Sequence, residues 1–326
     1  MPNEESSYNH ALNYSKDILG DSFEKLNITL KPDYEGEVLA TLIRKKAQKV
    51  SSQAVLYIHG FNDYFFQKEL ANNFNDNGYN FYALDLRKYG RSWMEHQKFN
   101  NVRSLREYDE EITKALEIIK LEANQKVILM GHSTGGLIVT NYAGNHLQNT
   151  LFHGIICNSP FYDFNLNLIE RKLGMPFLSF LGRFFPNKLI SSGFTKLYGY
   201  SLHFKKYGEW DYSLKWKPHD IPRVNLGFIN AIYKAQQNIH KGLHLSVPIL
   251  VLHSDTSIYS KKWTDRLLKG DAVLNVDHIQ KYASKLKGDV SIITINNGMH
   301  DLILSRKPVR AKVYKNIFEW VKEKFN

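Results

Sequence analysis

The segment Gly131-His132-Ser133-Thr134-Gly135 decides how this chain folds. It follows the apolar run 127–130 and precedes the helix-like run 137–143, so we predict a strand, a tight turn and a helix. Only very small residues let a strand and a helix pass this closely, which accounts for a glycine two positions to either side of Ser133. Such a turn strains the serine backbone and projects its hydroxyl above the sheet. The helix N-terminus that follows favours negative charge there, so Ser133 is a candidate nucleophile.

Two further segments carry related patterns. Residues 54–58 form an apolar run that leads into His59-Gly60-Phe61, and residues 82–92 read YALDLRKYGRS. Together with the G-x-S-x-G turn, they resemble α/β-hydrolases, in the branch of monoacylglycerol lipases, lysophospholipases and serine aminopeptidases. The second segment is similar to the D-x-R-G-x-G-x-S loop of that branch, with Lys88 where the first glycine usually stands. We expect Lys88 to change only the shape of this loop.

Strand-like and helix-like runs alternate along the chain, as an α/β fold requires. Residues 26–31 and 37–44 predict an antiparallel pair of strands. Near-continuous apolar runs predict parallel strands that are buried on both faces, at 54–59, 79–85, 126–130, 154–158, 247–253 and 289–295. Helices are predicted at 64–77, 104–122, 134–148, 276–287 and 308–325, with Asp277 as an N-cap. The alternation therefore predicts an α/β fold with a mostly parallel, doubly wound sheet, and the resemblance implies that this is an α/β-hydrolase fold.

The alternation stops between about residues 161 and 240, which are rich in aromatic side chains. The resemblance implies a cap inserted here above the nucleophile. We therefore divide the chain into a first core part (1–160), an inserted cap (161–240) and a second core part (241–326). Two interpretations of the cap remain open. Its residues 173–186 and 198–216 either pack on the core or line an acyl-chain pocket, and the first stretch is also suited to touching a membrane.

A serine hydroxyl needs a base, and that base needs a carboxylate to hold it in one tautomer. In this fold the order along the chain is serine, acid, histidine. The loop 296–301 follows the last predicted strand and carries His300, the only one of the 13 histidines in this place. His300 is therefore the predicted base, whereas His59 and His132 belong to the turns that they flank.

The acid has three candidates. Asp255 lies closest to the end of the strand 247–253, but the resemblance places the acid where this chain has Ser257. Asp271 begins the pattern Asp-x-Val-Leu, which is similar to the family's acid followed by two apolar residues, and it leaves room for one helix and one strand before His300. Asp277 is the third candidate. We favour Asp271.

The resemblance also implies an oxyanion hole made from the backbone N–H groups of Phe61 and Thr134. The single cysteine, Cys157, stands in an apolar run and is interpreted as a core residue. No cysteine–histidine metal spacing occurs, so we expect neither a metal nor a cofactor.

The net charge of +11 is compatible with several partners, while the hydrophobic content of 43% is ordinary for a globular protein. Lysine and arginine are spread along the chain without a nucleic-acid recognition pattern, so we expect no nucleic acid partner. A solvated surface is the default interpretation, and weak attraction to an anionic membrane surface is the alternative. Residues 1–7 are polar and no run is long enough to cross a membrane, so we expect a cytoplasmic protein. The oligomeric state stays open.

These patterns predict a serine hydrolase that cleaves carboxylic esters through an acyl-enzyme, with single-chain lipid esters of the monoacylglycerol or lysophospholipid type as favoured substrates. Two alternatives remain. A serine aminopeptidase would need a carboxylate such as Glu170 or Glu209 to hold the substrate ammonium group. A non-catalytic binding protein on the same scaffold would have no need of Ser133, His300 and a nearby aspartate together.

Overall fold

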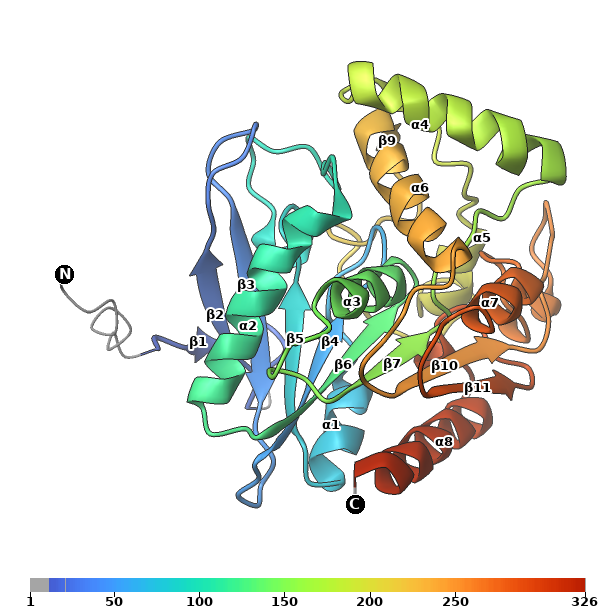
Figure 1. Ribbon diagram of the computed structural model, residues 1–326. Coiled ribbons are helices and arrows are strands. Elements are labelled where there is room, and N and C mark those ends of the chain that lie inside the picture. The colour runs from blue at the N-terminus through green and yellow to red at the C-terminus, as the bar shows by residue number, and fades with distance from the viewer. Residues whose placement is uncertain (1–11, 21, 326) are drawn as a thin grey trace.

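The computed structural model describes residues 12–20 and 22–325, so the N-terminal residues 1–7 discussed above lie outside the described part. Its centre is a nine-stranded sheet in the order β1-β2-β3-β5-β4-β6-β7-β10-β11 (Figure 1). The sheet strands are β1 (Ser15–Lys16), β2 (Glu24–Thr29), β3 (Leu39–Lys45), β4 (Gln53–Ile58), β5 (Asn80–Asp85), β6 (Lys126–His132), β7 (Gly154–Asn158), β10 (Ile249–Ser254) and β11 (Val290–Ile295).

The direction of the strands agrees with the sequence-based prediction. β1, β2, β3 and β5 pair in antiparallel fashion, and the strands from β5 to β11 in the sheet order pair in parallel. The mostly parallel sheet and the antiparallel pair β2–β3 are therefore confirmed.

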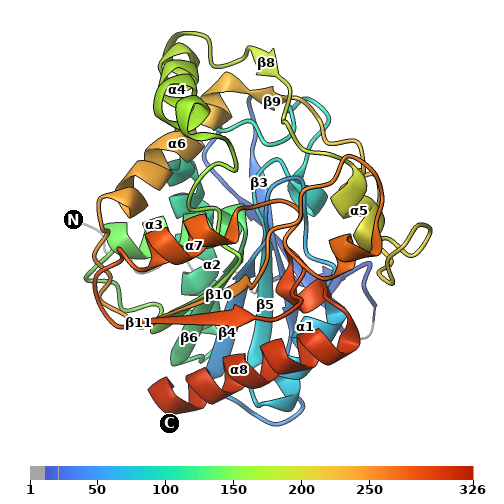
Figure 2. The same ribbon diagram turned by 90° about the vertical axis from the view of Figure 1, so that its right-hand side faces the viewer.

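Helices cover both faces of the sheet. The core helices are α1 (Lys68–Asp76), α2 (Asp109–Leu121), α3 (Thr134–Asn145), α7 (Val276–Ala283) and α8 (Lys307–Phe325). α2, α3 and α7 pack on one face, and α1 and α8 pack on the other (Figure 2). Short 3-10 turns lie at Gly90–Ser92, Leu105–Tyr108, Asp265–Leu268 and Leu302–Leu304.

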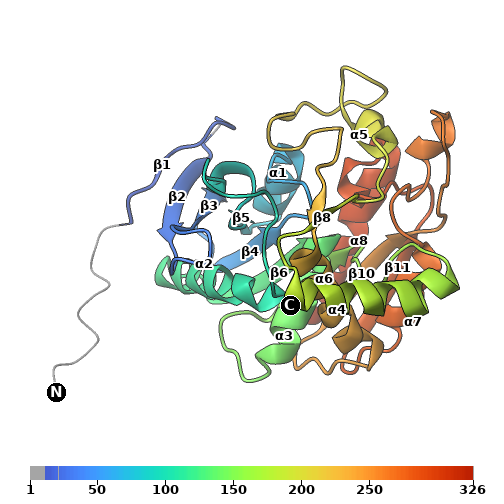
Figure 3. The same cartoon turned by 90° about the horizontal axis from the view of Figure 1, so that it is seen from above.

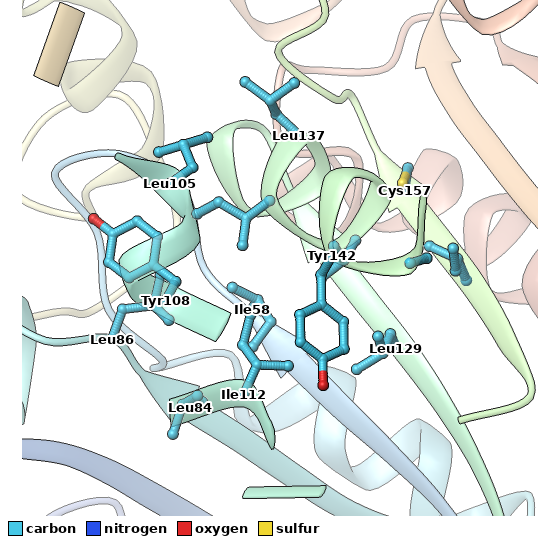
Figure 4. Packing of buried hydrophobic residues seen from close by; sticks show 14 of the residues in the cluster. Ile58, Leu84, Leu86, Leu105, Tyr108, Ile112, Leu129, Leu137, Tyr142 and Cys157 are labelled. Carbon is cyan, nitrogen blue, oxygen red and sulfur yellow. The ribbon is translucent and has the colours of Figure 1, made fainter. Parts of the chain in front are cut away.

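Strand β4 shows why the parallel strands read as continuous apolar runs. Leu56 and Ile58 face one core, while Val55 and Tyr57 face the other, and all four side chains are fully buried. Figure 4 shows part of the first core, in which Tyr142 of α3 lies beside side chains of α2 and of the sheet. A doubly covered sheet buries alternate residues on opposite faces, so no polar alternation remains in the sequence.

The segment 161–240 connects β7 to β10. It contains a π-helical turn (Glu170–Gly174), α4 (Met175–Phe184), β8 (Leu189–Ile190), α5 (Leu197–Leu202), β9 (Val224–Asn225) and α6 (Leu226–His240). β8 and β9 pair with each other and not with the main sheet. Seen from above, α4 lies across α6, which itself packs on α3 (Figure 3). These elements therefore gather on the side of the sheet where β6 ends and α3 begins.

Two details differ from the prediction. Asp277 is not the N-cap of α7, because the side chain of Asn275 accepts hydrogen bonds from the backbone N–H groups of Asp277 and His278. Lys88 does more than shape its loop: its ammonium group is fully buried and pairs with Asp33 at 2.7 Å and Glu35 at 2.8 Å. Lys88 therefore ties its loop to the turn between β2 and β3.

The close approach of α3 to the end of β4 leaves no space for a side chain at Gly135. A Cβ atom there would lie 2.3 Å from the carbonyl oxygen of Ile58 and 2.4 Å from that of His59. Both contacts are with backbone, so no side-chain rotation can relieve them.

We expect Gly135→Ala to destabilise the fold by about 3 kcal/mol, because the added methyl group pushes β4 and α3 apart. Gly174→Ala is the matched control, since a Cβ atom at Gly174 meets nothing within 4 Å. The measurement is thermal unfolding followed by circular dichroism. Equal melting temperatures for the two variants would contradict the close approach at Gly135.

Candidate active site

Ser133 occupies the turn between β6 and α3 with φ of 53° and ψ of −115°. This backbone conformation is strained for any residue with a side chain, so neighbouring structure must hold it. The N–H of Ser133 donates to the carbonyl of Asn158 at 3.0 Å, and its own carbonyl accepts from the N–H of Phe161 at 2.9 Å. The end of β7 therefore fixes the strained turn.

The structure brings Ser133, His300 and Asp271 together. Nε2 of His300 lies 3.0 Å from the Oγ atom of Ser133, and Nδ1 lies 2.9 Å from Oδ2 of Asp271. An ionised carboxylate only accepts hydrogen bonds, so Nδ1 carries the imidazole hydrogen and donates a hydrogen bond to Asp271. Nε2 is then free to accept the proton of the serine hydroxyl. All three residues are buried.

Asp271 is held in place by the loop on which it lies. Its Oδ1 accepts hydrogen bonds from the backbone N–H groups of Val273 at 2.8 Å and Leu274 at 2.7 Å. Its backbone forms a bridge opposite Ser257, the residue that stands where the resemblance places the acid. A loop thus leaves the end of β10, turns, and returns Asp271 to the position beside Ser257.

The other two acid candidates lie elsewhere. Asp255 is exposed, and its Oδ1 accepts a hydrogen bond from the N–H of Asn297 at 2.8 Å. Asp277 is exposed in the first turn of α7. Neither has a contact with His300, so Asp271 is the carboxylate that orients this imidazole in the structure.

Phe61 and Thr134 both line the cavity at Ser133. Thr134 opens α3, and Phe61 follows the end of β4. Neither backbone N–H donates a hydrogen bond to another described residue. Two unpaired N–H groups beside a serine hydroxyl can both donate to one oxygen atom of a bound molecule.

The two histidines that flank the motifs have structural contacts. His59 Nε2 accepts a hydrogen bond from the N–H of Leu86 at 3.1 Å, which fastens the loop after β4 to the end of β5. Burial lowers the pKa of His59, so its ring is neutral as this contact requires. The His132 ring packs against His300 with centroids 4.8 Å apart, and burial, with His300 as the second cause, lowers the pKa of His132 well below its usual value.

An open cavity of about 110 Å³ adjoins Ser133. One end is polar and is formed by Asp63, His132, Tyr198 and Lys217. The remaining wall is mainly apolar and includes Phe161, Phe164, Phe194, Val224, Phe228, Ile229, Ile232, Val273 and Leu274. Most of these apolar residues come from the segment 161–240, so this segment forms much of the cavity around Ser133.

A second, outer cavity adjoins the first. The two cavities share a wall that includes Phe161, Phe164, Phe194, Ile229 and Val273. The outer cavity continues below α4, where Met175, Leu178 and Ile190 line it. A mainly apolar path therefore leads from Ser133 toward the surface beside α4.

The lining differs from the prediction for residues 173–186 and 198–216. Within these stretches, Met175 and Leu178 line the outer cavity and Tyr198 lines the inner one, whereas Phe180 and Phe184 lie on the outer surface with exposed fractions of 53% and 62%. Phe180 and Phe184 therefore neither pack on the core nor line either cavity. Ser179 and Gly182 of α4 face α6, whereas the rings of Phe180 and Phe184 lie on the outside of the helix.

Sequence reasoning missed a buried ion pair at the polar end of the cavity. Lys217 Nζ lies 2.7 Å from Oδ2 of Asp63, and both residues are more than nine-tenths buried. Asp301 lies nearby, with its carboxylate accepting from Asn158 Nδ2 at 2.6 Å, and burial raises its pKa. Asp63 follows the segment His59-Gly60-Phe61 by two residues, so that motif was a usable signal, but nothing in the sequence singles out Lys217.

The carboxylates suggested for holding an ammonium group lie outside this cavity. Glu209 pairs with Arg306 and Arg310, and Glu170 bonds with the backbone N–H of Asn167. Asp63 does line the cavity, but Lys217 already pairs with it. Asp271 is occupied by His300.

Cys157 is fully buried, and burial raises the pKa of its thiol to about 11. A thiol with such a pKa is protonated at neutral pH and unreactive, as expected for a core residue. Within residues 12–20 and 22–325, no three histidine, cysteine, aspartate or glutamate side chains are arranged to hold a metal ion. No helix in this part of the chain is both long and apolar enough to span a bilayer.

Fold and site together define an α/β-hydrolase. The family model for serine aminopeptidase, S33, matches residues 49–306, and the chain belongs to this family of hydrolases. No curated protein matches the chain.

Several solved structures share the fold. A soluble variant of monoglyceride lipase from Saccharomyces cerevisiae, in complex with a substrate analog, is 17% identical, with 91% of this chain and 95% of that chain covered and a TM-score of 0.68. The monoacylglycerol lipase of Paleococcus ferrophilus is 19% identical, with coverages of 86% and 98% and a TM-score of 0.64. Est1E from Butyrivibrio proteoclasticus with bound ferulic acid is 15% identical, with coverages of 91% and 98% and a TM-score of 0.56. At these identities the likeness concerns the fold alone.

The contacts of Asp271 lead to a direct test of the acid. We expect Asp271→Asn to lower kcat for ester hydrolysis by about 10²–10⁴, because an amide favours the wrong imidazole tautomer. Asp255→Asn is the matched control and should stay near the wild-type rate. The measurement is steady-state hydrolysis of a short activated ester, and a stronger effect at Asp255 than at Asp271 would contradict this assignment.

Proposed function

We propose that this protein is a serine ester hydrolase that acts through an acyl-enzyme. In the first step, His300 Nε2 takes the proton of the Ser133 hydroxyl while Oγ attacks the ester carbonyl carbon. The N–H groups of Phe61 and Thr134 hold the oxyanion that forms. His300 then gives its proton to the leaving alkoxide oxygen, the ester C–O bond breaks, and an acyl-Ser133 ester remains.

The second step returns the enzyme to its starting state. His300 takes a proton from a water molecule, and the resulting hydroxide attacks the acyl carbonyl carbon. The proton goes back to Ser133 as the acyl–Oγ bond breaks, and a carboxylic acid is released. Asp271 stabilises the charged imidazole in both steps without itself taking a proton. The observation that carries this proposal is the continuous hydrogen-bonded chain from Ser133 through His300 to Asp271.

The favoured substrates are esters of a single acyl chain with a small polar alcohol, such as monoacylglycerols and lysophospholipids. The apolar path through the inner and outer cavities suits an acyl chain, and the polar end at Asp63, His132 and Lys217 suits an alcohol group. The monoglyceride and monoacylglycerol lipases among the solved structures support this choice of substrate.

A serine aminopeptidase is the second candidate, and the family description favours it. Such an enzyme needs an unpaired carboxylate that can hold the substrate's ammonium group. Among the described residues that line the inner cavity, Asp63 is the one carboxylate, and its partner is Lys217. The ion pair therefore favours ester hydrolysis over aminopeptidase activity.

A fluorophosphonate probe tests the nucleophile. The probe should label the wild-type protein stoichiometrically and fail to label Ser133→Ala, because only an activated serine attacks phosphorus. Ser159→Ala is the control, since Ser159 is also buried close to the turn and has a hydroxyl without a partner. Labelling of Ser133→Ala to the wild-type extent would refute the mechanism, and an unlabelled but folded wild-type protein would favour a binding function.

Chain-length profiles test the acyl path. Ile229 lines both cavities and Leu178 lines only the outer one. We expect Ile229→Trp to suppress hydrolysis of medium and long acyl esters, and Leu178→Trp to suppress only the long ones, because each buried methylene contributes about 0.8 kcal/mol. Both variants should hydrolyse acetyl esters at the wild-type rate. Identical profiles for the two variants would show that the acyl chain takes another path.

A further inference from the structure

The outer surface of α4 and of the π-helical turn before it carries large apolar side chains. They recur every three or four residues, as one face of a helix requires, and are between 53% and 72% exposed: Ile169, Leu173, Phe177, Phe180 and Phe184. Phe185 follows directly and is 59% exposed. We call these six residues the α4 face. Helix α4 lies at the edge of the molecule opposite α8 (Figures 1 and 2).

Helix α4 differs from an ordinary surface helix because it exposes most of its aromatic side chains. An ordinary surface helix buries its apolar side chains and turns polar ones to water. In α4, the small residues Ser179 and Gly182 face α6: Ser179 Oγ donates to Asn230 Oδ1 at 2.9 Å, and a Cβ atom on Gly182 would lie 2.2 Å from the carbonyl oxygen of Leu226. The described part of the chain leaves the apolar face uncovered. A contiguous exposed apolar patch of this kind marks an interaction surface.

Unpaired positive charges surround the α4 face. Residues 164–196 contain one acidic side chain, Glu170, and five basic ones: Arg171, Lys172, Arg183, Lys188 and Lys196. Arg171 pairs with Asp163. Lys172, Arg183 and Lys188 are exposed and form no ion pair with a described residue. The patch therefore combines apolar side chains with cations that have no partner within the described structure.

The outer cavity reaches the surface next to this patch. Its lining includes the exposed residues Leu166 and Phe194 together with Leu178 of α4. The helix that carries the α4 face therefore borders the outer cavity through Leu178.

We propose that the α4 face docks on an anionic lipid bilayer. Its phenylalanine side chains enter the boundary between headgroups and acyl chains, and Lys172, Arg183 and Lys188 contact the lipid phosphates. A second copy of this chain is a poorer occupant, because a symmetric contact through the α4 face would place the same cations against one another. Binding to vesicles does not depend on the chemistry at Ser133. That this binding delivers a lipid ester to the cavity rests on the proposed function.

Vesicle co-sedimentation tests this surface, with vesicles of phosphatidylcholine alone and of phosphatidylcholine mixed with phosphatidylglycerol. The wild-type protein should bind the anionic vesicles, and the triple variant Phe177→Ser/Phe180→Ser/Phe184→Ser should bind at least ~10-fold more weakly. The double variant Lys172→Gln/Arg183→Gln should bind anionic vesicles about fivefold more weakly for each charge removed, and added salt should also weaken binding by the wild-type protein. All exchanged residues are exposed, so the variants should keep the wild-type melting temperature.

Matched controls lie on other faces of the protein. Leu121→Ser removes an apolar side chain that is 63% exposed at the end of α2, and Lys312→Gln/Lys322→Gln removes two exposed cations from α8. Both controls should bind anionic vesicles like the wild type. Ser133→Ala should also bind normally, so that failure of the catalytic proposal is distinguishable from failure of this one.

Three results would overturn the proposal. The first is equal vesicle binding by the triple phenylalanine variant and by Leu121→Ser. The second is equal binding to neutral and anionic vesicles. The third is a wild-type dimer in solution that the triple variant converts to a monomer, since the α4 face would then be a contact between copies of this chain.

Discussion

The contact between β6 and α3 across the Ser133 turn is the constraint on which the rest of the site depends. A Cβ atom at Gly131 would lie 2.4 Å from the carbonyl oxygen of Gly135, so strand and helix touch backbone to backbone. This contact holds Ser133 at the end of a central strand. The strands on both sides run parallel to β6, and their carboxyl ends therefore meet at the same edge. Phe61 follows β4, Asp271 lies between β10 and α7, and His300 follows β11, so one edge of the sheet collects every group that the proposed chemistry uses.

Much of the fold could be predicted because strands that are buried on both faces of the sheet appear in the sequence as nearly continuous apolar runs. The runs 54–59 and 126–130 are apolar at almost every position, and each becomes a strand with side chains in two cores. Ser133 and His300 could be selected because each must lie in a short turn or loop directly after a particular predicted strand. The acid was ambiguous because the loop after β10 first passes Asp255 and returns only at Asp271. The bridge between Ser257 and Asp271 brings Asp271 to the position of the acid. The two residues lie far apart along the loop, so the spacing of residues in the sequence does not reveal this contact.

Other features could not be predicted because they depend on which way an element faces. The apolar spacing in 173–186 is the same whether the large side chains point inward or outward. Gly182 packs against the backbone of α6, and in this orientation of α4 the phenylalanine side chains point outward. Lys88 is a second example: its position in a loop pattern suggested a local effect, but its partners Asp33 and Glu35 lie in the turn between β2 and β3. Pairings of this kind join distant parts of the chain and leave no periodicity.

The ion pair between Lys217 and Asp63 also limits how the segment 161–240 can move. Two neighbouring bonds join the same two loops: Asn62 Nδ2 donates to the carbonyl of Pro218 at 3.2 Å, and the N–H of Ser213 donates to the hydroxyl of Tyr64 at 2.7 Å. Removing one partner of a buried ion pair costs about 3–5 kcal/mol, because the other charge is left buried and unpaired. The loop 213–218 is therefore the anchored side of the segment. A cavity that widened on this side would have to separate Lys217 from Asp63, so the polar end of the cavity is the end that this ion pair keeps closed.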